Sequence, residues 1–397
     1  MSNAFTEKEL RGLIDAFSAV EEYRKNTLNV RHKLCDIIAI TVCAVIAGAD
    51  GPSAIIQWAK VHQEKLTRIL RLKNGIPSRD TIRRTLEAIE PAAFQKCFLE
   101  WIDSFRESSR RELESGKKFK KEHVAIDGKT LRRSHDENAQ LSALHIVSAY
   151  ATDHGISLGQ LATEEKSNEI TAIPELLDAL SLDGSVVSID AMGTQTKIAE
   201  KIISKNAGYV LAVKDNQPKL HQAVKDFFAD VSSYGTRTSV FVEDEVSHGR
   251  IEHREYYQAT IPPDFAETRR FPNAETIGMV IRTHTAGDGK IKTETRYFIS
   301  SERRNGANFA CYVRRHWAIE NSLHWVLDMT FREDESRIRD RVVADNLSWI
   351  RRFTITLLKR HPSKTSLVGK RRQAGWSFDF LMELILGIHK TPDFTEK

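Results

Sequence analysis

Two short apolar runs of the sequence end in aspartate. "HVAID" ends at Asp127 and is followed by Gly128, and "SVVSID" ends at Asp190 and is followed by "AMG". A strand that ends in Asp places a carboxylate at the carboxyl edge of a sheet, where open α/β sheets bind their ligands. If the two strands are parallel neighbours, these like charges lie close together and need a cation, and Mg²⁺ or Mn²⁺ suits oxygen ligands. The alternative for either Asp alone is an ordinary turn or N-cap residue.

A third carboxylate is expected from the segment "HWAIENSLHWVLDMTF", residues 316–331. No Gly or Pro interrupts it, so we predict one helix, and its apolar residues cover most of the circumference, as in a helix buried nearly all round. Four polar residues recur at every fourth position and share one face: His316, Glu320, His324 and Asp328. Because a buried carboxylate is costly unless it is paired or bound to metal, Glu320 is the candidate third ligand. The alternatives are ion pairing with Arg315 or His324, or a zinc site shared with His324.

The segments around the two aspartates have the pattern of a mixed sheet flanked by helices. Short β-branched and aromatic runs predict five strands, at 123–127, 144–152, 156–163, 185–190 and 208–213. "DHG" at 153–155 predicts a tight turn, so the second and third strands are expected to form a hairpin. Helical patterns at 169–181 and 194–206 separate the last three strands, which predicts βαβ connections.

The sequence divides into regions of different texture. Residues 1–105 carry apolar residues at helical spacing and predict an all-helical N-terminal domain. Residues 106–121 are charged and Ser-rich and predict a linker, and 122–397 predict an α/β domain. Within that domain 234–304 is strand-like again, with "SHGR" and "AGDGK" as hairpin turns, so we expect a β-rich insertion before the basic helices of the C-terminal part.

Composition limits the class of protein. Of the 397 residues, 41% are hydrophobic and 28% charged, as in soluble globular proteins. The apolar run at 37–48 is too short to cross a bilayer and no signal segment opens the chain, so we expect a cytoplasmic protein without a membrane partner. The four cysteines include no CxxC pair, which argues against a disulfide framework and against a zinc ribbon.

Basic residues suggest contact with a polyanion. A helix beginning after Ser78 exposes three arginines on its first turns: Arg79, Arg83 and Arg84. Together with a helix at 60–72 it resembles a helix-turn-helix that reads DNA, although helical bundles contain such pairs without that role. Basic residues also gather at 110–121 and in the acid-free stretch 346–378, as solvated surface or as a nucleic-acid contact.

At this point the sequence resembles a known family, the DDE transposases of bacterial insertion sequences, in the branch of the H-repeat-associated proteins. The likeness is carried by "AIDGKTLRRS", "LHIVSAY", "EKSNEITAIPELL", "SIDAMGTQ", "YVLAVKDNQP" and "RRHWAIENSLHWVLDMTFREDESRIR". These motifs run in order from about residue 120 to 350, and the N-terminal helices resemble the small domain that precedes the catalytic domain in this branch. The resemblance implies a ribonuclease-H-like core whose Asp127, Asp190 and Glu320 hold two divalent metal ions, Mg²⁺ or Mn²⁺.

The resemblance also suggests residues that contact DNA. Related transposases carry a Tyr, Arg, Glu, Lys signature around the third acid, and Tyr312, Arg315 and Glu320 match it. Arg315 lies one residue further from the Glu than the pattern has it, and Leu327 occupies the Lys position, so the role of that Lys does not carry over. We expect phosphates or displaced bases to contact polar residues after the strands and near the third acid, namely Lys129, Arg132, Lys214, Asn216, Gln217, Arg315 and His316. The alternative for these residues is ordinary exposed surface.

The resemblance implies a transposase that binds the ends of a DNA element, cleaves them and joins them to target DNA. Because two ends must be held together, we expect a homodimer on DNA, associated with the nucleoid. The insertion at 234–304 either reaches the partner's DNA or braces the helix that carries Glu320. Two competing hypotheses remain: a non-catalytic DNA-binding relic, and a stand-alone metal-dependent nuclease on the same fold.

Overall fold

The computed structural model describes residues 17, 20, 22, 24, 30–70, 72–99, 106, 121–136, 140–163, 169–230, 237–247, 250–285 and 291–386. The predicted linker, the basic cluster at 110–121 and the centres of both predicted hairpin turns in the insertion lie largely outside these residues. No helix of the described part is long and apolar enough to cross a membrane.

The described strands form one nine-stranded mixed sheet in the order β3-β2-β1-β4-β5-β9-β8-β7-β6. Its first half consists of β1 (His123–Thr130), β2 (His145–Ala151), β3 (Ile156–Thr163), β4 (Val186–Ile189) and β5 (Gly208–Val213). Strands β1, β2 and β3 are antiparallel neighbours, whereas β1, β4 and β5 run parallel. This is the predicted ribonuclease-H-like arrangement of five strands.

The parallel pair β1 and β4 sets the position of the two aspartates. Ile126 pairs with Ile189, so Asp127 and Asp190 each stand one residue further along neighbouring strands. Up to that point both strands are buried on both faces, as expected for the centre of a covered sheet, with His123 and Ser188 as polar residues among apolar ones. The predicted parallel neighbourhood is therefore confirmed.

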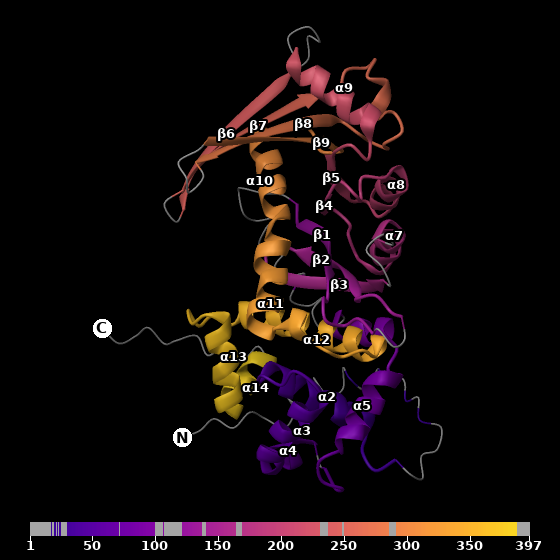
Figure 1. Ribbon diagram of the computed structural model, residues 1–397, viewed down its shortest axis with the longest axis vertical. Coiled ribbons are helices and arrows are strands. Elements are labelled where there is room, and N and C mark those ends of the chain that lie inside the picture. The colour runs from indigo at the N-terminus through magenta and orange to yellow at the C-terminus, as the bar shows by residue number, and fades with distance from the viewer. Residues whose placement is uncertain are drawn as a thin grey trace, which may run out of the picture.

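Helices cover both faces of the sheet (Figure 1). On one face lie α7 (Glu169–Ala179), α8 (Thr196–Ser204) and α9 (Pro218–Ala229), and on the other lie α10 (Gly306–His316) and α11 (Trp325–Phe331). Helices α7 and α8, which separate β3, β4 and β5 along the chain, occupy the predicted positions. α10 packs across β1, β4 and β5, which places the chain that follows it above the edge with the aspartates.

The N-terminal helices pack against the C-terminal part of the chain. They are α2 (Leu34–Ile46), α3 (Pro52–Val61), α4 (Gln63–Leu70) and α5 (Arg79–Ala88), and the C-terminal helices are α12 (Arg341–Arg360), α13 (Leu367–Trp376) and α14 (Phe378–Leu386). The long helix α12 is buried along most of its length between α2, α5 and strand β3. Because its buried residues belong to the same core as both sides, the helical region is attached to the sheet through α12.

The insertion extends the sheet. Its strands are β6 (Thr238–Ser247), β7 (Arg250–Thr260), β8 (Thr276–Thr285) and β9 (Ile291–Ser300), and β9 pairs antiparallel with β5. α10 rests on the extension: the Phe309 ring lies against Gly278, where a side chain would overlap it. The guanidinium of Arg314 on α10 also pairs with Glu245 of β6 at 2.6 Å. These contacts favour the bracing role that the sequence left open.

The segment at 316–331 is not the single helix predicted. α10 ends at His316, a turn follows at Trp317, and residues Glu320–His324 form a π-helix before α11 begins. The amide of Trp325 donates to the carbonyl of Glu320, five residues back, so one turn holds an extra residue. The segment is also less buried than predicted, because three large side chains are exposed: Trp317, Trp325 and Met329.

Candidate active site

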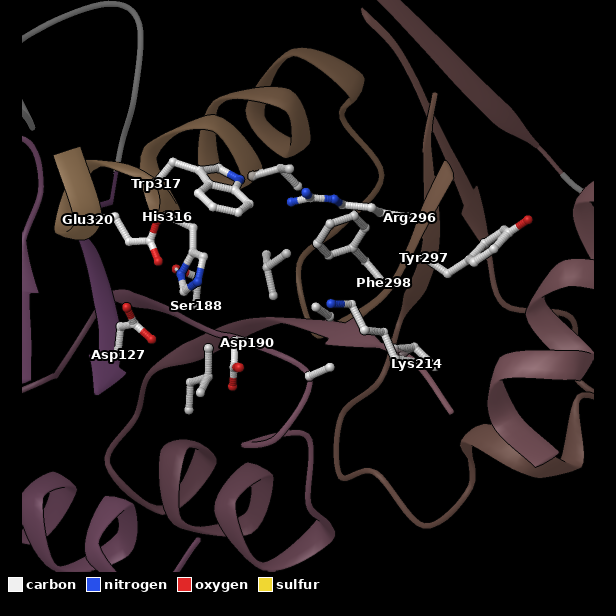
Figure 2. Close-up of a pocket in the computed structure, with 16 residues that line it drawn as sticks. Asp127, Ser188, Asp190, Lys214, Arg296, Tyr297, Phe298, His316, Trp317 and Glu320 are labelled. Carbon is white, nitrogen blue, oxygen red and sulfur yellow. Dashed lines mark hydrogen bonds between the residues drawn. The ribbon is translucent and has the colours of Figure 1, made fainter. Parts of the chain in front are cut away.

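Three carboxylates from three elements line one pocket. Asp127 comes from β1, Asp190 from the end of β4 and Glu320 from the start of the π-helix, and all three point into the same space (Figure 2). Asp190 also accepts hydrogen bonds through Oδ1 from the amides of Met192 and Gly193, at 3.1 and 3.3 Å. One oxygen of Asp190 therefore holds its loop as a turn residue would, and the side chain still lines the pocket.

The two strand carboxylates are electrostatically strained. Burial, together with the negative charges of Asp190, Glu320 and Glu169, raises the pKa of Asp127 to about 7, although a backbone hydrogen bond acts in the opposite direction. Burial likewise raises the pKa of Asp190, and Glu169 contributes there too. Because several carboxylates meet where water is partly excluded, the pocket favours the binding of a cation.

Glu169, the first residue of α7, is a neighbour of this site that the sequence reasoning missed. Its carboxylate is buried and lies 2.6 Å from Nε2 of His145, whose Nδ1 contacts the hydroxyl of Thr130 at 2.8 Å. Any side chain at position 128 would overlap both His145 and Glu169, so Gly128 lets this pair approach β1 beside Asp127. The sequence signal for Glu169 is its place in "EKSNEITAIPELL", where it is the second Glu and the first residue of the helix predicted at 169–181.

The helix side of the pocket is attached to the sheet by polar contacts. Arg315 forms an ion pair with the buried carboxylate of Asp153, and Nδ1 of His316 lies 2.9 Å from the hydroxyl of Ser188 on β4. Burial and the charge of Arg296 lower the pKa of His316 to about 4. Arg315 therefore reaches the sheet, while His316 lines the pocket as a neutral ring.

His324 lies behind Asp127. Its Nδ1 is 3.5 Å from Oδ2 of Asp127, and burial, followed by the charges of Arg352 and Lys129, lowers its pKa to about 3. A neutral His324 is placed to orient the carboxylate of Asp127. In the described part no group of three or more His, Cys, Asp and Glu side chains is arranged to hold a metal ion by itself, and this applies to the three carboxylates of the pocket as well as to a zinc site at His324.

Beyond the acids the pocket is lined by apolar and basic side chains, with a volume of about 180 Å³. Val210 and Phe298 contribute to its wall, and the Arg296 guanidinium lies over the Trp317 ring at 4.6 Å from the ring centre. The exposed Lys214 amine stands at the opposite rim from Glu320 (Figure 2). A negative substrate with a flat or apolar portion would match these walls.

Two of the predicted DNA contacts are buried. Lys129 is only 8% exposed, and its amine pairs with Asp334 at 2.5 Å and with Asp328 at 2.8 Å. Gln217 is also buried, and its amide donates to the carbonyl of Thr194 at 2.8 Å. Both side chains hold neighbouring segments in place, so their burial does not favour the predicted contacts with DNA.

Asn216, Arg132 and the three arginines of α5 lie at the surface. Asn216 is exposed and donates to the carbonyl of Ala191 beside Asp190, and Arg132 is exposed with its Nε 3.2 Å from Asp334. The three arginines of α5 are exposed as predicted, with Ser78 as the N-cap. Arg83 pairs with Glu87 on its own helix, and Arg79 lies 3.4 Å from Asp80.

The acid-free stretch 346–378 is largely interior, contrary to a reading as a DNA-binding surface. Arg351 and Arg352 are buried against the carboxylate of Glu333, and Arg352 also donates to the hydroxyl of Ser148. Lys370 is buried and donates to two backbone carbonyls. Most of this positive charge therefore stabilises the packing of α12 and α13, although Arg372 is exposed.

Family comparison agrees with the geometry of the site. Residues 118–358 match the family described as "Transposase DDE domain", and residues 14–102 match "DDE_Tnp_1-associated". The chain thus belongs to the DDE transposase family.

Among its relatives is the "H repeat-associated putative transposase YhhI" of Escherichia coli strain K12, which is 36% identical over 96% of this chain and 99% of that protein. The "Putative transposase YncI" of Escherichia coli O157:H7 is 37% identical over 98% of both chains. The family places this chain in the branch of the H-repeat-associated proteins.

Proposed function

We propose that this protein binds the ends of a DNA element and catalyses metal-dependent strand cleavage and strand transfer at the pocket of Asp127, Asp190 and Glu320. The observation that carries the proposal is the meeting of these three carboxylates, from two parallel strands and one helix, in a pocket with basic and apolar walls. The coarser assignment, a transposase, follows from the family.

The chemistry of the donor set fits divalent metal ions. Mg²⁺ is commonly held by one or two carboxylates together with substrate phosphates, so a closed cage of protein ligands is not required. Asp127, whose pKa burial and neighbouring carboxylates raise to about 7, would have that charge repulsion relieved by a bound cation, and Asp190 stands beside it after the parallel strand. When bound, the two ions would polarise the scissile phosphate and stabilise charge on the entering and leaving oxygens.

The chain's own residues would then position DNA for an in-line displacement. The Lys214 amine at the pocket rim is placed for a phosphate beside the scissile one, and the stacked Arg296 and Trp317 offer a cation and an aromatic face. Water attacks first and frees a 3′-OH at the element's end, and that hydroxyl then attacks target DNA in the same pocket. Because the second nucleophile is itself DNA, two protomers must hold two ends, so we propose a homodimer on DNA.

Cleavage and joining of labelled duplexes that carry the inverted repeat bordering the coding region would test the proposal. The wild-type protein with Mg²⁺ should cut at the repeat end and join the freed end to a plasmid. Asp190→Asn should do neither while still binding the duplex, and Asp264→Asn, an exposed Asp on a loop, is the matched control. Binding without cutting by the wild type would support the relic, and cutting without joining would support the nuclease.

A further inference from the structure

A chain of side-chain hydrogen bonds leads away from the pocket beneath α10. Nδ1 of His316 is 2.9 Å from the hydroxyl of Ser188, and that hydroxyl is 2.9 Å from Nε2 of His123 on β1. Nδ1 of His123 is in turn 2.8 Å from the hydroxyl of Thr152, just after β2. The chain thus joins the pocket to the opposite end of β1.

Its middle is closed to solvent. His123 is fully buried, Ser188 is 2% exposed, and the Tyr312 ring of α10 lies over the imidazole of His123. Its ends are open: His316 lines the pocket, and Thr152 is half-buried beside the turn at 153–155. Protons can therefore enter or leave only at the ends.

Two arrangements of protons satisfy every link. In the first, His316 donates through Nδ1 to Ser188, Ser188 donates to Nε2 of His123, and His123 donates through Nδ1 to Thr152. The Thr152 hydroxyl then turns toward the carbonyl of His123, which lies 3.4 Å away. In the second, every donor and acceptor is exchanged. The arrangements interconvert when each proton moves one place in the same direction.

Charged intermediates are disfavoured along this path. Burial, then the charges of His316 and Arg315, lower the pKa of His123 well below its ordinary value. Burial also lowers the pKa of His316, so both rings are neutral near pH 7. A concerted shift suits such a chain, because no ring becomes an imidazolium.

We propose that this chain, the Thr152 relay, carries protons to and from the reacting oxygens in the proposed strand cleavage, on which the inference rests. As the nucleophile's oxygen bonds to phosphorus, its proton passes to Nε2 of His316. The proton on Nδ1 of His316 passes to Ser188, and the Ser188 proton passes to Nε2 of His123. The proton on Nδ1 of His123 then passes to Thr152, and the Thr152 hydroxyl proton passes to water. The bond from phosphorus to the leaving 3′ oxygen breaks with its electron pair on oxygen. The reverse shift, fed by a water proton at Thr152, protonates that oxygen and resets the chain.

Thr152 gives the sharpest test because it lies at the far end, away from the three carboxylates. Thr152→Val keeps the shape and removes the hydroxyl, Thr152→Ser restores the hydroxyl, and Thr283→Val makes the same change at a half-buried position on β8. We expect Thr152→Val to slow single-turnover cleavage on the order of tenfold, with unchanged duplex binding, and Thr152→Ser to recover the rate. The rate measured across H₂O and D₂O mixtures should curve for the wild type, because several protons move together, and become nearly linear for Thr152→Val.

Equal cleavage rates of Thr152→Val and Thr283→Val would overturn the relay. So would an imidazolium form of His123 or His316 in ¹⁵N spectra of the metal-free protein near neutral pH, since the two proton arrangements need neutral rings. The spectra require no activity. A wild type that cuts neither the repeat duplex nor a supercoiled plasmid with Mn²⁺ would instead count against the proposed function.

Discussion

The carboxylates on the strand side of the site are held differently from the one on the helix side. Asp127 lies within β1 and Asp190 just after β4, each one residue beyond the last pair of the parallel ladder, and burial raises both pKa values. Glu320 is exposed and begins a π-helix, and the contacts of α10 closest to it in the chain are those of Arg315 and His316 with the sheet side. The strand acids should therefore respond mainly to charge, and the helix acid mainly to its attachments.

The largest effect is expected from removing a carboxylate on either side. Asp127→Asn, Asp190→Asn and Glu320→Gln should each reduce end cleavage by on the order of a thousandfold or more, because each ligand acts on the transition state. Gel-shift assays should show nearly unchanged end binding. Substantial cleavage by Glu320→Gln alone would contradict the assignment of Glu320 as the third ligand. Asp328, further along the helix, would then be the next candidate.

The second prediction concerns the pH dependence of stability, which should distinguish Asp127 on the strand side from Glu320 on the helix side. The folded-state pKa of Asp127, about 7, lies above its unfolded value, so the stability of the protonated carboxyl is present at low pH and lost as pH rises through 7. Asp127→Asn should melt on the order of 5 °C above the metal-free wild type near pH 8, with the difference vanishing near pH 4. Differential scanning calorimetry would measure it. The matched Glu320→Gln should show a smaller gain, because Glu320 is only one of several causes that raise the pKa of Asp127, and equal gains would erase the distinction.

The attachments of the helix side should have a smaller effect on cleavage. Asp153→Asn removes the charge that holds Arg315, and we expect cleavage to fall about tenfold with unchanged affinity for end duplexes. Arg315→Met should match it if Arg315 only positions Glu320. If Arg315 also binds phosphate, Arg315→Met alone will weaken binding in a titration by fluorescence anisotropy.

The smallest effect concerns positive charge remote from the pocket. Arg84→Ala and Arg372→Ala remove exposed charges, and each should reduce the slope of log affinity against log salt by about one if it meets a phosphate. Arg371 is a poor target, since its guanidinium donates to the carbonyl of Thr330 and lies over the Phe331 ring. An unchanged slope for both variants would make these arginines ordinary solvated surface.

Much of the fold was predictable, because strand patterns and turns are local signals. The end of an apolar run placed Asp127 and Asp190, and the order of strands and helices predicted that they are neighbours. Burial of cations was not predictable, since it depends on partners far along the chain. Lys129 meets Asp334, and Arg352 meets Ser148, only after folding.

The same reason hid the polar network behind the site. Nothing in the local sequence distinguishes Ser188 from any serine in a strand, yet it joins two histidines that are almost two hundred positions apart in the numbering, His123 and His316. The π-helix was not predictable, because its residues favour helix in general and only packing decides whether an α-helix or a π-helix forms.

The π-helix at Glu320–His324 also affects how this chain is aligned with its relatives. A π turn is one residue longer than the α-helical turn it replaces, so an inserted residue can be absorbed there while the helices on either side keep their buried faces. Counting positions across it is therefore ambiguous by one. The signature lysine position, occupied by Leu327, lies beyond this turn, and a count shifted by one reaches Val326 or Asp328, so no shift of one residue supplies a lysine there. Relatives of this protein should be aligned separately on the two sides of Glu320–His324.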